Sequence, residues 1–227
     1  MIEVKDLYKA FGENVILNGV GFHLLKGENL GILGKSGSGK SVLTKCIVRL
    51  IEPDFGEIKV LGKDILKMSL NELNEIRKDI GYLFQGGALY DSMNVRENLE
   101  FPIRRTQMAS NKHEVNERVE QALRSVGLLD AINKMPAELS GGMKKRIGLA
   151  RALILRPKVI LYDEPTTGLD SVTSGEISEL ILKVQEEYNA SSIIITHDMK
   201  CAKIATDKIK ILENGTFLTE GTYDELS

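Results

Sequence analysis

The chain has 227 residues, enough for one large core or a core with an inserted subdomain, but short for two independent catalytic cassettes. Lys and Arg total 30 against 32 for Asp and Glu, and this formal net charge of −2 indicates no broad polyanion-binding surface, so nucleic acid is not an expected partner. The cysteines, Cys46 and Cys201, lie far apart without CxxC spacing or nearby His, which favours two reduced thiols in the cytosol over a disulfide or metal site.

The first residues predict strands joined by turns. The start, residues 1–6, alternates like a strand and lacks the basic and apolar segments of a signal peptide, so export is not expected. Apolar residues alternate or cluster again at 15–17 and 20–24, after the turn residues Gly12-Glu13-Asn14. Residues 2–24 therefore predict an antiparallel edge sheet.

A buried strand at 29–33 leads into a glycine-rich loop, and apolar residues with helical spacing follow at 42–50. The loop reads Gly34-Lys35-Ser36-Gly37-Ser38-Gly39-Lys40-Ser41, which fits the phosphate-loop pattern. Small residues there let successive backbone N–H groups point at phosphate oxygens at a helix N-terminus. Lys40 would add a charge on the β/γ phosphates, and Ser41 would offer its hydroxyl to Mg²⁺. The strand–loop–helix context predicts a phosphate loop that binds a nucleotide, with Ser41 as a ligand of Mg²⁺.

The middle of the chain changes from strands to helices. Strands are predicted at 58–61 and 80–84, and from Asp91 the pattern becomes helical. Residues 115–126 place their apolar side chains on one face, with Ser110 or Asn111 able to cap the start and Gly127 able to end it. We expect a helical subdomain at 91–157 inserted into a core made of residues 1–90 and 158–227.

The last third predicts parallel strands and a final hairpin. Apolar runs at 159–162 and 192–195 are separated by a helical pattern at 177–184, which implies crossover connections. Asn214-Gly215 lies between runs at 208–212 and 216–218, a strong hairpin signal. All apolar runs are far shorter than the roughly 20 residues that cross a bilayer. Any membrane part must therefore come from other chains.

Two carboxylates follow the strand at 159–162. Asp163 and Glu164 would emerge at its C-terminal end near the phosphate loop, where open α/β sheets bind ligands. Asp163 would hold Mg²⁺, directly or through water, and Glu164 is the candidate general base that polarises the attacking water. Taken alone, the pair could also be a solvated acidic turn.

A second anion-binding turn precedes that strand. Leu139-Ser140-Gly141-Gly142-Met143 supplies a hydroxyl, glycine amides and a helix N-terminus. With the phosphate loop before it and Asp163-Glu164 after it, the chain resembles the ATP-binding subunit of an ABC transporter. The resemblance implies an α/β fold of the P-loop NTPase class, an ABC cassette with a mixed core sheet, an N-terminal antiparallel β-subdomain and the inserted α-helical subdomain at 91–157.

The resemblance also implies partners and a place of action. Two chains would form a head-to-tail homodimer that sandwiches two ATP molecules, each between Lys40 of one chain and Ser140, Gly141 and Gly142 of the other. The dimer would drive an integral membrane permease at the cytoplasmic face of the inner membrane, as a peripheral protein, and further lipid-binding and regulatory subunits could join it. Met143 replaces the usual glutamine of the signature, which removes a side-chain hydrogen bond but not the Ser-Gly-Gly clamp.

Several roles rest on the same resemblance. Gln85 matches the Q-loop glutamine that touches metal and water, His197 the switch histidine on the γ-phosphate, and Asp170 the D-loop that crosses to the partner subunit. Phe11 matches the aromatic position that stacks on adenine. It could equally be a core residue, and nearby Tyr8 is the alternative for stacking.

The segment after Gln85 predicts the branch of the family. Gly86-Gly87-Ala88-Leu89-Tyr90-Asp91-Ser92-Met93 is similar to the Mla/Mce-type ATPases of bacterial lipid transport, as is Met143. We expect this loop to be exposed and to contact the permease through Leu89, Tyr90 and Met93. An ATPase of an importer for amino acids or another small solute is the alternative.

Two readings of other classes are weaker. A soluble ABC protein acting on DNA or ribosomes would carry long coiled-coil insertions or two fused cassettes, and this chain has neither. A nucleotide-binding regulatory module without turnover would have a broken Asp163-Glu164 pair or lack His197, and both are intact.

Overall fold

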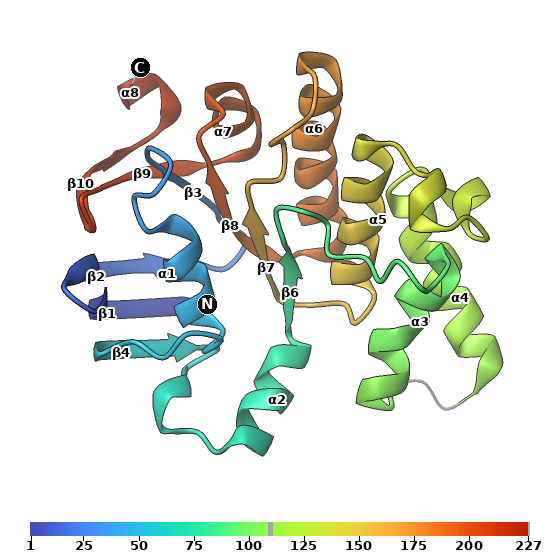
Figure 1. The fold of residues 1–227 in the computed structure, drawn as a ribbon, viewed down its shortest axis with the longest axis horizontal. Coiled ribbons are helices and arrows are strands. Elements are labelled where there is room, and N and C mark those ends of the chain that lie inside the picture. The colour runs from blue at the N-terminus through green and yellow to red at the C-terminus, as the bar shows by residue number, and fades with distance from the viewer. Residues whose placement is uncertain (109–110, 227) are drawn as a thin grey trace.

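The fold contains two β-sheets with helices around them. The structure, a computed structural model, describes residues 1–108 and 111–226. Figure 1 shows the antiparallel sheet at one side, the core sheet in the middle and the helices α3 and α4 at the opposite side. This arrangement confirms the expected ABC cassette fold, with its mixed core sheet, N-terminal antiparallel sheet and helical insertion.

The core sheet has six strands in the order β10-β9-β3-β8-β7-β6. All neighbouring pairs are parallel except β9 with β10, so the sheet is mixed. The strands are β3 (Asn29–Leu33), β6 (Ile80–Leu83), β7 (Val159–Asp163), β8 (Ser191–Thr196), β9 (Lys208–Glu213) and β10 (Thr216–Gly221). The parallel order brings the C-terminal ends of β3, β7 and β8 to one edge.

Helices cover both faces of this sheet, and the strands alternate between the two clusters. Val159 and Leu161 of β7 pack with α1 (Lys40–Ile47) and the antiparallel sheet. Ile160 and Tyr162 pack instead with α5 (Gly141–Leu153), α6 (Ser171–Tyr188) and α7 (Met199–Ala205). A strand buried on both sides is the reason that its sequence reads as a continuous apolar run.

The antiparallel sheet has the order β2-β1-β4-β5. Its strands are β1 (Ile2–Phe11), β2 (Asn14–Leu24), β4 (Phe55–Val60) and β5 (Lys63–Asp64). The two runs predicted at 15–17 and 20–24 form one continuous strand, β2. Gly19, with φ 72°, lies in this strand between Asn18 and Val20, where the pairing with β1 is irregular.

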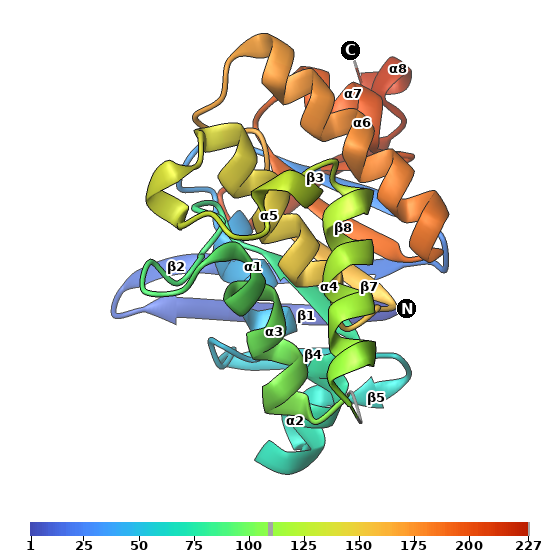
Figure 2. The same cartoon turned by 90° about the vertical axis from the view of Figure 1, so that its right-hand side faces the viewer.

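The helical insertion begins with α3 (Val95–Thr106) and α4 (Lys112–Ser125), which lie in front of the core strands in Figure 2. Asn111 caps α4, because its Oδ1 accepts a hydrogen bond of 2.9 Å from the Glu114 N–H. Ser110, the other expected cap, lies outside the described residues. Short 3₁₀ turns, η2 (Leu129–Ala131) and η3 (Pro136–Glu138), lead to α5.

The helix α5 belongs to the insertion by sequence and to the core by packing. Its buried side chains share one cluster with α3 and α4 and also with β7, β8 and α6. The boundaries at 90/91 and 157/158 stay a prediction. The packing means that α5 connects the inserted helices directly to the core sheet.

Three helices were not predicted: α7, the C-terminal α8 (Tyr223–Leu226) and α2. Helix α2 (Leu70–Lys78) follows η1 (Ile65–Lys67) and begins with a capping box, in which the side chains of Ser69 and Glu72 bond each other's backbone N–H. The pattern Ser-x-x-Glu was therefore the signal to look for. The predicted helix at 42–50 is shorter than expected, because α1 ends at Ile47 and Arg49 takes a φ of 52°.

The chain ends in the predicted hairpin and a short helix, α8 (Tyr223–Leu226). Asn214 and Gly215 have φ values of 49° and 76°, as the tight turn between β9 and β10 requires. Within residues 1–108 and 111–226, no helix is long and apolar enough to cross a membrane.

Candidate active site

The phosphate loop connects β3 to α1 and is organised around the Lys40 side chain. The Lys40 ammonium is 5% exposed and donates hydrogen bonds to the carbonyls of Gly34, at 2.7 Å, and Lys35, at 3.0 Å. The loop is thereby folded around its own cation. Because the loop also opens the N-terminus of α1, backbone N–H groups and a positive charge converge, which suits a phosphate.

Two glycines of the loop allow close backbone approaches. A Cβ atom on Gly34 would lie 2.3 Å from the Leu212 carbonyl oxygen. Gly39 has a φ of 101°, and a Cβ there would lie 2.8 Å from the Ile16 carbonyl oxygen. The Ser38 hydroxyl is buried in the loop and has no hydrogen-bond partner among the described residues. A narrow cradle with a free buried hydroxyl fits a bound anion.

The acidic pair emerges at the end of β7, as predicted. Ser41 Oγ at the start of α1 donates a hydrogen bond of 2.8 Å to Asp163 Oδ1, so the hydroxyl and the carboxylate share one position beside the loop. Gln85, just after β6, lines a cavity beside the phosphate loop that Ser41 also lines. These three groups offer oxygen ligands, which Mg²⁺ prefers when phosphates complete its coordination. The side chains present therefore fit the expected ion.

Glu164 is held by contacts from several elements. Its carboxylate Oε2 accepts a hydrogen bond of 3.0 Å from the Thr167 hydroxyl and lies 2.8 Å from His197 Nδ1. Its Oε1 lies 3.7 Å from the Lys40 ammonium. The carboxylate thus lies beside the cation that would hold the phosphates, within reach of a water molecule attacking there.

The backbone of Glu164 is unusual as well. Its φ is 52°, a left-handed conformation that a side chain with a Cβ rarely adopts. The Glu164 N–H donates to the Ile195 carbonyl of β8 at 2.9 Å, which anchors the turn to the sheet. Strained residues of this kind occur most often at functional sites, where surrounding contacts hold them in place.

Lys40, Ser41, Gln85, Glu164 and His197 line one cavity of about 660 Å³. Its walls include part of the phosphate loop (Ser36, Gly37, Gly39, Lys40 and Ser41) and the side chains Phe11, Ile16, Val42, Gln85, Glu164, Thr167 and His197. Sequence reasoning missed Thr167 as a site residue. Its spacing of three residues from Glu164, within one turn, was the available signal.

The structure separates the two aromatic candidates for adenine stacking. Phe11, at the end of β1, lines the cavity and is 51% exposed, and the Lys9 ammonium lies 5.3 Å from its ring centroid. Tyr8 does not line this cavity. Its hydroxyl lies against Gly19 on β2, 3.0 Å from the position of a Cβ there.

The signature residues lie away from this cavity. Ser140 caps α5, where its Oγ accepts a 3.2 Å hydrogen bond from the Met143 N–H, and Asp170 caps α6. The two helix starts are neighbours, since a Cβ on Gly142 would lie 2.7 Å from the Thr173 methyl group. Neither Ser140, Gly141, Gly142 nor Asp170 lines the cavity of Lys40. One chain therefore does not bring its own signature to its own phosphate loop.

The loop after Gln85 differs in part from the expectation. Tyr90 is 44% exposed, and its ring lies 5.0 Å from that of Phe101. Leu89 is half-buried and packs against the helical cluster, so the expectation of an exposed side chain was wrong for Leu89. Met93 is half-buried too. The physical reason is that α5 and α3 approach the loop closely enough to cover its apolar side chains.

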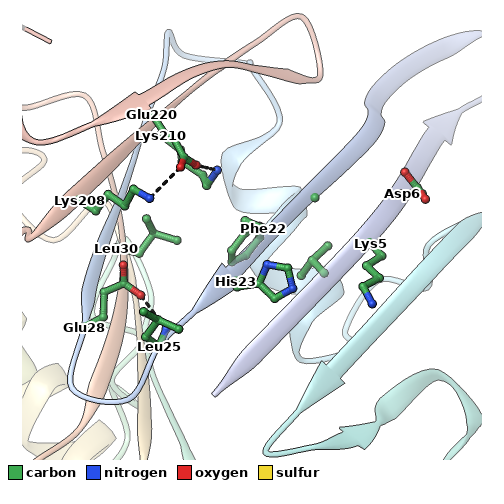
Figure 3. A pocket seen from close by; sticks show the side chains of 12 residues that line it. Lys5, Asp6, Phe22, His23, Leu25, Glu28, Leu30, Lys208, Lys210 and Glu220 are labelled. Carbon is green, nitrogen blue, oxygen red and sulfur yellow. Dashed lines mark hydrogen bonds and ion pairs between the residues drawn. The ribbon is translucent and has the colours of Figure 1, made fainter. Parts of the chain in front are cut away.

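A second cavity, of about 400 Å³, lies between β2 and the β9–β10 hairpin (Figure 3). Its lysines are already paired: Lys208 and Lys210 both contact Glu220, and Lys5 lies 2.5 Å from Glu3. Hydrogen bonds from the two lysines of β9 lower the pKa of Glu220 to about 2. With its lysines paired and no predicted site residue in its lining, this cavity is not the candidate site.

Comparisons with known proteins agree on one family. The ABC transporter family model matches residues 17–167. Among curated relatives, the chain is 40% identical over its whole length to TRIGALACTOSYLDIACYLGLYCEROL 3, chloroplastic, of Arabidopsis thaliana, spanning 70% of that protein. It is 43% identical over 93% of its length to the probable ribonucleotide transport ATP-binding protein mkl of Mycobacterium leprae, spanning 60% of it. It is 38% identical over 96% of its length to methionine import ATP-binding protein MetN 1 of Bacillus licheniformis, spanning 66% of it.

A solved structure with the same fold is a dimer of the ATP-binding cassette MJ0796, described as a post-hydrolysis state bound to ADP and Pi. The chain superposes on it with a TM-score of 0.89 at 33% identity, covering 98% of this chain and 99% of the other.

Proposed function

Since the chain belongs to the ABC transporter family and is an ABC-type ATPase that hydrolyses ATP, we propose that it powers a separate membrane permease in lipid transport across the bacterial envelope. The site residues, the Mg²⁺ ligands and the partner surfaces that follow are parts of the same proposal. The observation that carries the chemistry is Glu164, with its carboxylate beside the buried Lys40 ammonium and hydrogen-bonded to Thr167 and His197.

In this proposal the phosphate loop binds the β and γ phosphates of ATP through its N–H groups and Lys40. Ser41, Asp163 and Gln85 would hold Mg²⁺, and the bound ion would neutralise charge on the phosphates. Glu164 accepts the proton of the attacking water, and His197, whose Nδ1 lies 2.8 Å from Glu164 Oε2, orients the carboxylate and reaches the γ-phosphate. Phe11 stacks on the adenine.

The base assignment is tested by Glu164→Gln. The amide keeps the shape but cannot accept the proton, so we expect ATP binding to persist while kcat falls by about 100-fold or more. Phosphate release and ATP binding are measured on the same preparation. Phosphate release at the wild-type rate by this variant would refute the assignment of Glu164 as the base.

Each complete site in this proposal needs two chains. The start of α5, at Ser140, Gly141 and Gly142, has the groups that suit an anion. These residues do not line the Lys40 cavity of the same chain. A head-to-tail homodimer would place this start over the phosphates bound by the other chain, with Asp170 beside it. The MJ0796 cassette, whose solved structure is dimeric, supports this arrangement.

The lipid assignment rests on residues 86–93 with Met143, and on a relative that bears the name of a galactolipid and is 40% identical over the whole chain. A second cargo class has its own support. A methionine import protein is 38% identical, so import of an amino acid is the alternative, and the ribonucleotide named for mkl would be another small solute. The cargo itself is decided by the permease.

The permease contact is proposed at the loop after Gln85, with Tyr90 as its exposed centre. The Tyr90 ring packs on Phe101, and the Arg151 guanidinium lies over the ring, 5.7 Å from the ring centroid. These two contacts hold the exposed ring in place for a partner. Leu89 packs against the helical cluster and supports the loop from beneath, and Met93 is half-buried. Gln85 at the start of this loop lines the ATP cavity, which lets closure around ATP move the contact.

Tyr90→Asp tests this surface. In the isolated subunit the new carboxylate has Arg151 nearby, so folding and ATP binding should persist. Against an apolar partner the charge would be buried at a cost, so co-purification with the permease and lipid transfer into vesicles should fall by at least about tenfold.

Phe55→Asp is the matched control, because Phe55 is 72% exposed on β4 of the other sheet and should tolerate the change. Normal assembly by Tyr90→Asp would move the contact elsewhere. A permease that co-purifies but carries methionine in vesicles would overturn the lipid assignment and leave the ATPase assignment standing.

A further inference from the structure

A buried lysine of the signature helix contacts the catalytic region from behind. Lys145 on α5 is 6% exposed. Its ammonium donates hydrogen bonds to the backbone carbonyl oxygens of Gln85 and, at 3.0 Å, Glu164. Burial lowers the pKa of Lys145, whereas the nearby carboxylates Asp163 and Glu164 raise it. A single buried cation thus joins three segments that are far apart in the sequence.

The contact falls on the most constrained backbone of the site. Glu164 has a left-handed φ of 52°, and its N–H is already bound to the Ile195 carbonyl at 2.9 Å. Lys145 satisfies the carbonyl of the same residue. The Glu164 carbonyl also accepts a longer hydrogen bond, of 3.3 Å, from the Thr167 N–H within the same turn. Both polar backbone groups of Glu164 are therefore fixed, and Lys145 supplies the contact that ties the carbonyl to α5. Without Lys145 the carbonyl would keep only the longer bond within its own turn, so the peptide that follows Glu164 could shift and carry the carboxylate away from Lys40.

We propose that Lys145 is a positioning residue for ATP hydrolysis, which holds the Glu164 backbone in its working conformation and ties this conformation to the signature helix and to Gln85. The inference rests on the proposed role of Glu164 as the base. Because Ser140 begins the same helix, any displacement of α5 pulls on the carbonyls of Gln85 and Glu164 together. The Lys145 ammonium therefore connects two groups of one chain: α5, which would clamp the ATP bound by the partner, and Glu164, the base that acts on the ATP bound by the same chain.

A second cation of α5 provides the natural comparison. Arg151 donates to the Ala88 carbonyl at 2.5 Å and lies over the Tyr90 ring, so it too fastens the loop after Gln85 to α5. The described contacts of Arg151 include none to Glu164. Loss of Arg151 should loosen the loop alone, whereas loss of Lys145 should also release the base. The two residues thus separate loop support from positioning of Glu164.

The test compares Lys145→Met with Lys144→Met, which removes the neighbouring half-exposed lysine of the same helix. We expect Lys145→Met to bind ATP with an affinity within about threefold of wild type and to lower kcat by about 10- to 100-fold with little change in KM, as lost hydrogen bonds from a charged group would do. Lys144→Met should keep both constants, and Arg151→Met should lower kcat less than Lys145→Met.

A merely structural role is excluded by a double-mutant cycle. If Lys145 acts through Glu164, adding Lys145→Met to Glu164→Gln should cause no further loss in single-turnover hydrolysis, whereas independent effects would multiply. Lys145→Gln fills the space and keeps one amide donor, so it should lie between wild type and Lys145→Met. It supplies the same comparison if Lys145→Met does not fold.

The inference is overturned by a kcat within about twofold of wild type in Lys145→Met, or in Lys145→Gln where only that variant folds, and equally by multiplicative losses in the cycle. Unimpaired hydrolysis by Glu164→Gln alone would instead refute the proposed base. The two failures are therefore distinguishable.

Discussion

At the scale of single residues, the place of the Glu164 carboxylate was predictable from the sequence, whereas the conformation of its backbone was not. Its position after an apolar strand predicted a carboxylate near the phosphate loop, and the structure places it 3.7 Å from the Lys40 ammonium. The left-handed φ of 52° was not predictable, because the local sequence carries no glycine or asparagine there to signal it. Contacts from β8, α5 and Thr167 hold it, and these are tertiary.

Phe11 gives a prediction at the same scale. Stacking of an aromatic ring on a base is worth roughly 1–3 kcal/mol, so Phe11→Ala should weaken ATP binding by about 5- to 100-fold and leave kcat at saturation near wild type. Titration with a fluorescent ATP analogue measures the affinity. Tyr8→Ala is the control and should change affinity little, since Tyr8 faces Gly19 rather than the cavity. The reverse ranking of the two variants would assign the adenine to Tyr8.

At the scale of elements, the predictions were best where the hydrophobic period was clear. The buried strands at 29–33 and 159–162 and the hairpin turn at Asn214-Gly215 are confirmed, because each depends on local pattern alone. Helix α2 was missed because its apolar residues are few, although Ser69 and Glu72 marked its start. Residues 15–24 were divided in two because Gly19 interrupts the alternation of β2.

The β9–β10 hairpin carries a prediction about pH. Hydrogen bonds from Lys208 and Lys210 lower the pKa of Glu220 from 4.5 to about 2. A carboxylate with a lowered pKa in the folded state adds stability that is complete above pH 4.5 and is lost as pH falls toward about 2. The side chains of Glu220 and Lys208 are nearly half exposed, so Glu220→Gln should lower the free energy of unfolding by about 0.2–1 kcal/mol at neutral pH.

Urea unfolding of wild type and Glu220→Gln at neutral pH and at about pH 3.5 checks this, and the difference between the two proteins should narrow at the lower pH. High salt at neutral pH should narrow it too. A difference that is independent of both pH and salt would show that the glutamine acts through packing rather than charge.

At the scale of the whole molecule, each chain carries one half of each of two proposed ATP sites: the half with the phosphate loop and the half with the signature. Lys40 and Glu164 meet at one cavity, while Ser140 caps α5 outside it. The helix α5 shares its buried side chains with the inserted helices and with the core sheet, so movement of the signature is coupled to the core. In the proposed head-to-tail dimer, this division would let one chain bind ATP and still require a second chain for turnover.

Ser140→Arg tests the division. The bulky cation blocks the clamp, so the isolated subunit should still bind ATP while hydrolysis falls by about 100-fold or more. In a mixture with Lys40→Ala chains, a mixed dimer has one site with both defects and one with neither, and hydrolysis should return in part. Phosphate release is measured over a series of mixing ratios, with each variant alone as control. A complete absence of rescue, with mixed dimers shown to form, would contradict the shared site unless dimers with one intact site are inactive.

The sequence by itself determined the family, the motifs of the candidate site and most of the strands. These follow from local patterns: a glycine loop between strand and helix, a strand ending in Asp163-Glu164, and a Ser-Gly-Gly helix start. The tertiary structure decided which of these groups meet. In the folded chain Phe11 lines the cavity and Tyr8 does not, and Leu89 is half-buried against the helices. Thr167 and Lys145 both form hydrogen bonds with Glu164. Such contacts join residues distant in the chain, and their geometry is set by how sheets and helices pack rather than by any short stretch of sequence.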